Sequence, residues 1–102
     1  MSMITDMLYE ENDRLERSII AYEKTIESLP KGTIVWKKIK KKAYPYLQWR
    51  DGSLVKSRYI KQKELNDMRE SVDRRREYEH NIKGMKKSQI EIERMLGRSN
   101  RL

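Results

Sequence analysis

Residues 32–60 constrain the fold of this chain more than any other stretch. The segment is GTIVWKKIKKKAYPYLQWRDGSLVKSRYI, and it contains both tryptophans of the chain. Its β-branched and aromatic residues suit a pleated strand, and Asp51-Gly52 is typical of a tight hairpin turn. Long charged stretches with helical periodicity lie on either side. The sequence therefore predicts a small antiparallel β-meander between two helices.

The three expected strands cover residues 33–40, 44–50 and 54–60, with turns at Lys41-Lys42 and Asp51-Gly52. Two-residue turns would place Trp36 opposite Leu47, and Trp49 opposite both Ile34 and Leu54. Because side chains alternate along a strand, these five apolar residues would share one face and pack against the helices. The other face would carry Val35, Lys37, Ile39, Tyr44, Tyr46, Gln48, Arg50, Val55, Ser57 and Tyr59.

The first helix is expected over residues 3–29. Its apolar seam repeats every 3.5 residues on average, as in a coiled coil. The seam consists of Leu8, Asn12, Leu15, Ile19, Tyr22, Ile26 and Leu29. Asn12 is the polar exception. It marks either a solvated end of the seam or a polar contact that sets the register between helices. Pro30 and Gly32 follow and predict the end of the helix.

The second helix is expected over residues 62–97. Its stripe skips a step across Arg75, which predicts a local change in supercoiling. Gly97 is expected to cap the helix, and residues 98–102 to form a frayed tail. The stripe consists of Leu65, Met68, Val72, Tyr78, Ile82, Met85, Gln89, Ile92 and Leu96.

These elements predict an α+β fold and a single domain over residues 1–102. The meander would lie between two long helices that form an antiparallel, coiled-coil-like hairpin. Only 36% of the residues are hydrophobic and 39% are charged. A core this small gains stability from self-association, so we expect a homodimer.

The residue inventory argues against catalysis. The chain has no cysteine, which excludes disulfides, thiolate zinc sites and cysteine nucleophiles. Its one histidine, His80, lies in a charged helical segment, and its glycines form no phosphate-binding loop. We therefore expect no enzyme, no catalytic or metal-binding residue, no cofactor and no small-molecule substrate.

The sequence also predicts a cytoplasmic protein without a membrane partner. The first residues lack the basic and apolar regions of a signal peptide. No apolar run approaches the roughly 20 residues that span a bilayer.

The positive charge is concentrated in the predicted sheet. Residues 1–30 carry three basic and seven acidic side chains, and residues 64–102 carry ten and eight. Residues 31–63 carry eleven basic side chains and one acidic one. Such a concentration favours an anionic partner, namely nucleic acid or a nucleoprotein complex. Tyrosines between the basic residues could stack on bases. The candidate binding residues are Lys37, Lys38, Lys40, Lys41, Lys42, Tyr44, Tyr46, Arg50, Lys56, Arg58, Tyr59 and Lys61.

The same stretch resembles a family of short, uncharacterised bacterial and archaeal helix–β-meander–helix proteins. The resemblance covers about 30 residues, from the helix stop Leu29-Pro30-Lys31-Gly32 through the strand motif YPYLQWR to the final motif VKSRYI. The hairpins are also similar to segments near the start of some transposases and to the arm-type DNA-binding domains of integrases. These resemblances imply a mobile-element setting and contact with nucleic acid.

Three functional hypotheses follow. The first is a non-enzymatic, mobile-element-type protein whose basic meander binds DNA or RNA while its helices mediate assembly. The second is a phage or mobile-element anti-defence inhibitor or adaptor, similar to an anti-CRISPR protein, that docks on a protein or nucleoprotein complex. The third is a purely structural coiled-coil module.

Overall fold

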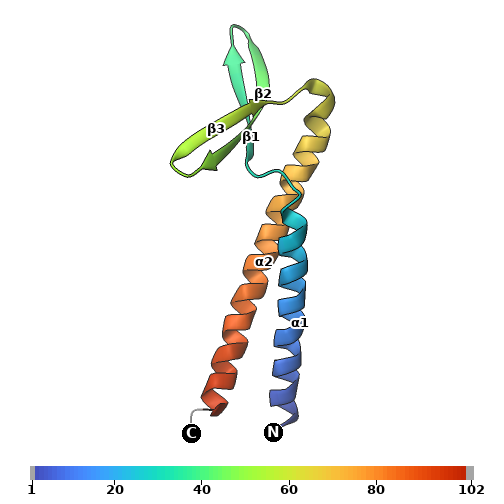
Figure 1. The fold of residues 1–102 in the computed structure, drawn as a ribbon, viewed down its shortest axis with the longest axis vertical. Helices are drawn as coiled ribbons and strands as arrows, with labels where there is room; N and C mark the ends of the chain where they lie inside the picture. The colour runs from blue at the N-terminus through green and yellow to red at the C-terminus, as the bar shows by residue number, and fades with distance from the viewer. Residues whose placement is uncertain (1, 101–102) are drawn as a thin grey trace. The chain divides into compact units, whose positions relative to one another are not determined.

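The computed structural model describes residues 2–100 and has an α+β fold, as predicted. Helix α1 (Met3–Ile26) leads into strands β1 (Thr33–Ile39), β2 (Lys42–Asp51) and β3 (Leu54–Tyr59). A short 3₁₀ turn, η1 (Gln62–Glu64), then leads into helix α2 (Leu65–Asn100) (Figure 1). No helix within the described residues is long and apolar enough to cross a membrane.

Helix α1 is three residues shorter than predicted at its C-terminal end. It ends at Ile26 and not at Leu29. Pro30 explains the difference, because a proline ring clashes with the carbonyl four residues earlier, which here belongs to Ile26. At the other end, the Thr5 N–H donates to Ser2 Oγ at 3.1 Å, so Ser2 caps the helix.

Helix α2 begins later and ends later than predicted. Residues 62–64 form the 3₁₀ turn, and the α-helix runs from Leu65 to Asn100. Gly97 does not cap it. Among the described residues only Gly32 and Gly52 are glycines with positive φ, the conformation that a glycine cap adopts. The expected frayed tail is therefore helical as far as Asn100, and residues 101–102 lie outside the described part.

The sheet is antiparallel in the order β1-β2-β3, but both hairpins differ from the predicted register by two residues. Ile34 lies opposite Leu47, Trp36 opposite Pro45, and Trp49 opposite Lys56. The cause is that each turn is displaced by one residue. The central residues are Lys40-Lys41 and Gly52-Ser53, and the first of each pair has a positive φ. A shift of two residues keeps every side chain on its predicted face.

The chain divides into two compact units, here called the helical unit (residues 1–26 and 78–102) and the sheet unit (residues 27–77). Helix α2 contributes to both. The expectation of one folding domain over residues 1–102 stays a prediction.

The core of the sheet unit lies on the tryptophan-bearing face of the sheet, which we call the Trp face. Leu47, Ile60 and Val72 are buried there. Ile34, Trp49, Leu65 and Met68 pack around them. The start of α2 thus covers part of this face, as predicted. Trp36 and Leu54 do not join the core and are 52% and 62% exposed. Both had been expected to pack, and the shifted registers place them nearer the hairpin turns.

Contacts in the helical unit run in opposite order along α1 and α2. The rings of Tyr22 and Tyr78 lie 5.1 Å apart, and Gln89 Nε2 donates to Glu16 Oε2 at 2.7 Å. Leu15, Ile92 and Leu96 form a buried cluster, with Leu8 and Met85 packed against it. Apart from Glu16, these residues belong to the two predicted stripes.

Candidate nucleic-acid interface

Three tyrosines gather on the face of the sheet opposite the Trp face, which we call the Tyr face. The register creates the cluster, because Tyr46 of β2 lies directly opposite Tyr59 of β3. Their ring centroids are 5.6 Å apart at 66°, and those of Tyr44 and Tyr59 are 6.3 Å apart at 62°. Both pairs have the edge-to-face geometry that aromatic rings favour. Tyr59 remains 45% exposed, so this aromatic surface is open to a partner.

Lys37 completes the cluster from β1. It lies opposite Tyr44, and its Nζ stands 4.5 Å from the centroid of the Tyr46 ring. The same ammonium donates to Ser57 Oγ at 3.0 Å. A cation over a tyrosine ring is attracted by the π electrons, so the charge is held at the aromatic cluster. An ammonium has three donors, and this arrangement leaves capacity for a phosphate oxygen.

Further basic residues surround the Tyr face. Lys40 and Lys41 form the β1–β2 turn. Lys42 and Arg50 lie on β2, on the same face as Tyr44 and Tyr46. Lys61 follows β3, and all five side chains are exposed. An exposed cation keeps its hydration until it meets an anion, so these residues suit phosphate contact.

The remaining three candidate residues belong to the Trp face. Side chains alternate along a strand, and this alternation puts Lys38, Lys56 and Arg58 on the same face as the tryptophans. Lys56 Nζ makes an ion pair with Asp51 Oδ2 at 2.7 Å. Arg58 lines a separate hollow together with Glu64 and Asp67. The structure therefore does not bring these residues together with the tyrosines.

Sequence reasoning missed a second feature of the sheet unit, a hollow of about 470 Å³ beside the end of β3. Its lining includes Trp36, Lys42, Tyr44, Tyr59 and Gln62. Trp36 had been assigned to the core because large apolar residues on one strand face usually pack there. Its position opposite Pro45 takes it out of the core, and no sequence signal marks that shift.

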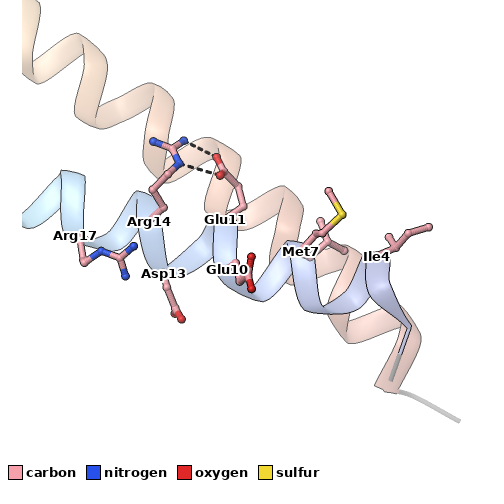
Figure 2. A pocket seen from close by; sticks show the side chains of 8 residues that line it. Ile4, Met7, Glu10, Glu11, Asp13, Arg14 and Arg17 are labelled. Carbon is pink, nitrogen blue, oxygen red and sulfur yellow. Dashed lines mark hydrogen bonds and ion pairs between the residues drawn. The ribbon is translucent and has the colours of Figure 1, made fainter.

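A further hollow belongs to the helical unit and offers little chemistry. It measures about 770 Å³ and runs along α1 beside Ile4 and Met7. Figure 2 shows the Arg14 guanidinium bonded to both carboxylate oxygens of Glu11 in this hollow. The hydrogen bond from Arg14 lowers the pKa of Glu11, so this carboxylate remains ionised and paired. Across residues 2–100, no group of three or more His, Cys, Asp or Glu side chains is placed to hold a metal ion.

Comparison with protein families gives a match over residues 10–70. The model described as Domain of unknown function (DUF6788) matches residues 10–70, which is more than half of the chain. The chain belongs to the DUF6788 family. No curated protein matches the chain, and no solved structure does.

The DUF6788 match includes most of α1, the whole sheet and the start of α2. Every candidate binding residue named above therefore lies within the family segment. The match shows no relation to transposases or integrases, so those resemblances stay predictions.

Proposed function

We propose that this chain is a small, non-enzymatic nucleic-acid-binding protein of mobile-element type. One observation carries the proposal. Tyr44, Tyr46, Tyr59 and Lys37 form a packed aromatic and cationic cluster on an open sheet face. The face is flanked by the lysines of a hairpin turn.

The charge distribution supports the same conclusion. The sheet unit holds fifteen basic and seven acidic residues, whereas the rest of the chain holds nine of each. The whole net charge of +8 therefore belongs to the sheet unit. A polyanion would be attracted to this unit and would release its condensed counterions on binding, which gives salt-dependent affinity.

The lysine and tyrosine side chains would contact different parts of the nucleic acid. Lysines at 40, 41 and 42 would neutralise phosphates, which gives affinity without regard to sequence. The tyrosine rings would stack on bases or lie against sugars, and their hydroxyls could donate to phosphate oxygens. The proposed activity is binding alone, without a chemical change in the ligand.

The helical unit would serve assembly. Its contacts Tyr22–Tyr78 and Glu16–Gln89 favour an antiparallel, coiled-coil-like hairpin. Ile4, Met7 and Ile90 leave apolar surface exposed at 71%, 59% and 50%. A second copy would bury such surface, so the proposal includes a homodimer.

Fluorescence anisotropy tests the proposal. The full chain is titrated into labelled duplex DNA, single-stranded DNA and single-stranded RNA at roughly 50 and 200 mM salt. Six or more phosphate contacts predict a loss of about a thousandfold or more in affinity over that range. Absence of binding to all three ligands at the lower salt would overturn the proposal.

A matched pair of charge reversals locates the site. Changing Lys40, Lys41 and Lys42 to Glu is expected to weaken binding at least about 100-fold, because three phosphate contacts become repulsive. Changing Lys83, Lys87 and Arg94 to Glu alters the net charge equally but lies in the helical unit. That control is expected to bind within a few fold of wild type. Equal losses in both variants would contradict a site on the sheet.

One observation favours a second candidate, the anti-defence inhibitor or adaptor. Leu54 and Val55 beside the Gly52 turn are 62% and 56% exposed, and phosphate contact gives them no role. Exposed apolar residues at a hairpin tip suit docking on a protein. Binding to one nucleoprotein complex without affinity for free nucleic acid would favour this candidate.

A further inference from the structure

The hollow beside β3 exists because two neighbouring strands end at different points. The last paired residues of β2 and β3 are Tyr46 and Tyr59, and the Ile60 N–H donates to Pro45 O at 3.0 Å. Strand β2 continues to Lys42, so residues 42–44 run past the end of β3. The chain then turns into η1, which brings Gln62 to the rim.

The lining combines aromatic surface with polar groups. Trp36 and Tyr59 contribute exposed rings, at 52% and 45% exposure. Pro45 is buried and Leu65 half-buried, so they supply apolar surface. Lys42 brings a positive charge, and the Gln62 amide can both donate and accept hydrogen bonds.

This combination fits a nucleobase. A volume of about 470 Å³ lies within the range of pockets that take small ligands. Aromatic rings stack on the flat face of a base, and an amide can pair with its polar edge. A lysine at the rim can hold the phosphate attached to the same nucleotide.

We infer that the ligand of the sheet unit is single-stranded nucleic acid, and that one unpaired base enters the hollow and stacks on Trp36. The inference rests on the proposed function and narrows its substrate class. Bases within a duplex are stacked and paired, so they cannot enter without first being extruded at a cost. A single strand has no such cost and binds more tightly.

Binding of matched oligonucleotides tests this inference. The wild-type chain is titrated into a labelled 20-nucleotide single strand and into its blunt duplex at the same salt. We expect at least tenfold tighter binding to the single strand. The Trp36→Ala variant is expected to lose about 5- to 150-fold on the single strand, because one stacking contact is removed. Its affinity for the duplex is expected to change less than twofold.

Two variants control for loss of structure. Trp36→Phe keeps a stacking ring and is expected to restore most of the single-strand affinity. Leu54→Ala removes another exposed apolar side chain of the Trp face, and is expected to bind both ligands like wild type. Tryptophan emission adds a direct signal, since a base stacked on Trp36 quenches it and the Trp36→Phe variant loses that quenching.

The possible failures are distinguishable. Absence of binding to both oligonucleotides, each prepared as DNA and as RNA, overturns the proposed function and this inference together. Equal affinity of wild type for duplex and single strand overturns the inference alone. So does a Trp36→Ala variant that binds the single strand within twofold of wild type.

Discussion

Arg75 Nη1 donates a hydrogen bond to the carbonyl oxygen of Leu29 at 2.6 Å. The contact joins α2 to the segment that precedes Pro30, and it is partly buried. It lies at the step that the apolar stripe of α2 skips. Arg75 occupies the skipped position of the stripe. The Leu29 carbonyl, just beyond the end of α1, lies there, and a leucine at position 75 could not donate to it.

Removal of this donor is expected to destabilise the protein. Arg75→Met keeps the length of the side chain but leaves the Leu29 carbonyl without its charged partner, at a cost of about 1–3 kcal/mol. Urea unfolding followed by circular dichroism measures the change. Arg74→Met is the matched control, since Arg74 is exposed and is expected to change stability by less than about 0.5 kcal/mol. Equal stability of the two variants would contradict a structural role for the Arg75 contact.

The glycines at 32 and 84 are expected to respond in opposite directions to alanine. Gly32 has a φ of +131°, and a Cβ there would collide with the backbone oxygen of Gln48. Gly32→Ala should therefore cost about 3 kcal/mol or more. Gly84 lies within α2, and a Cβ there meets no atom within 4 Å. Gly84→Ala should raise stability by up to about 1 kcal/mol. Thermal unfolding of both variants checks the signs, and a stable Gly32→Ala protein would refute the close approach to β2.

Lys40 holds the β1–β2 turn in a strained conformation. It is the one described non-glycine residue with positive φ, at 51°. Lys40→Gly relieves that strain and is expected to add about 0.5–1 kcal/mol to the free energy of unfolding. Lys41→Gly has no positive φ to relieve, so it should be neutral or destabilising. The two variants carry the same charge, and urea titration of each against wild type separates the backbone effect from electrostatics. A gain in Lys41→Gly alone would place the turn one residue later.

Asn12 of α1 contains an unsatisfied buried polar atom. Its Oδ1 is buried and has no hydrogen-bond partner. Asn12→Leu is expected to raise stability by about 1–3 kcal/mol, because an unsatisfied oxygen is replaced by apolar surface within the seam. Exposed Asn66→Leu is the control and should change little.

The same variant distinguishes the two interpretations of Asn12. Sedimentation velocity of wild type and Asn12→Leu reports the number of chains per particle. If Asn12 sets the register between helices, its replacement by leucine should allow other oligomeric states to form. Lower stability of Asn12→Leu, with the oligomeric state unchanged, would contradict the expected gain in stability.

The faces of the sheet could be predicted from sequence although the register could not. Displacing a turn by one residue moves every opposite partner by two, so Ile34 still faces the same side as Leu47 and Trp49. The turn positions were harder, since Lys40-Lys41 lacks the Gly or Asn that marks a tight turn. Helix α1 followed from its seam, and its early end depends on the clash between Pro30 and Ile26, which seam periodicity does not report.

The candidate site was predictable only in part, for the same reason. Alternation placed Lys37, Tyr44 and Tyr46 together, because that inference needs only the parity of the strands. The hollow depends on where β3 stops relative to β2. Strand ends are set by backbone pairing, so the exposure of Trp36 could not be inferred from its residue type.

The unequal division of charge between the units would link the stability of the sheet to the proposed ligand. Fifteen basic residues in one small unit repel each other and lower its resistance to unfolding. A bound phosphate chain would cancel that repulsion and lock the strands in place. The sheet unit would therefore be most stable with its ligand bound. The stability of the helical unit, which has no net charge, would not depend on that ligand.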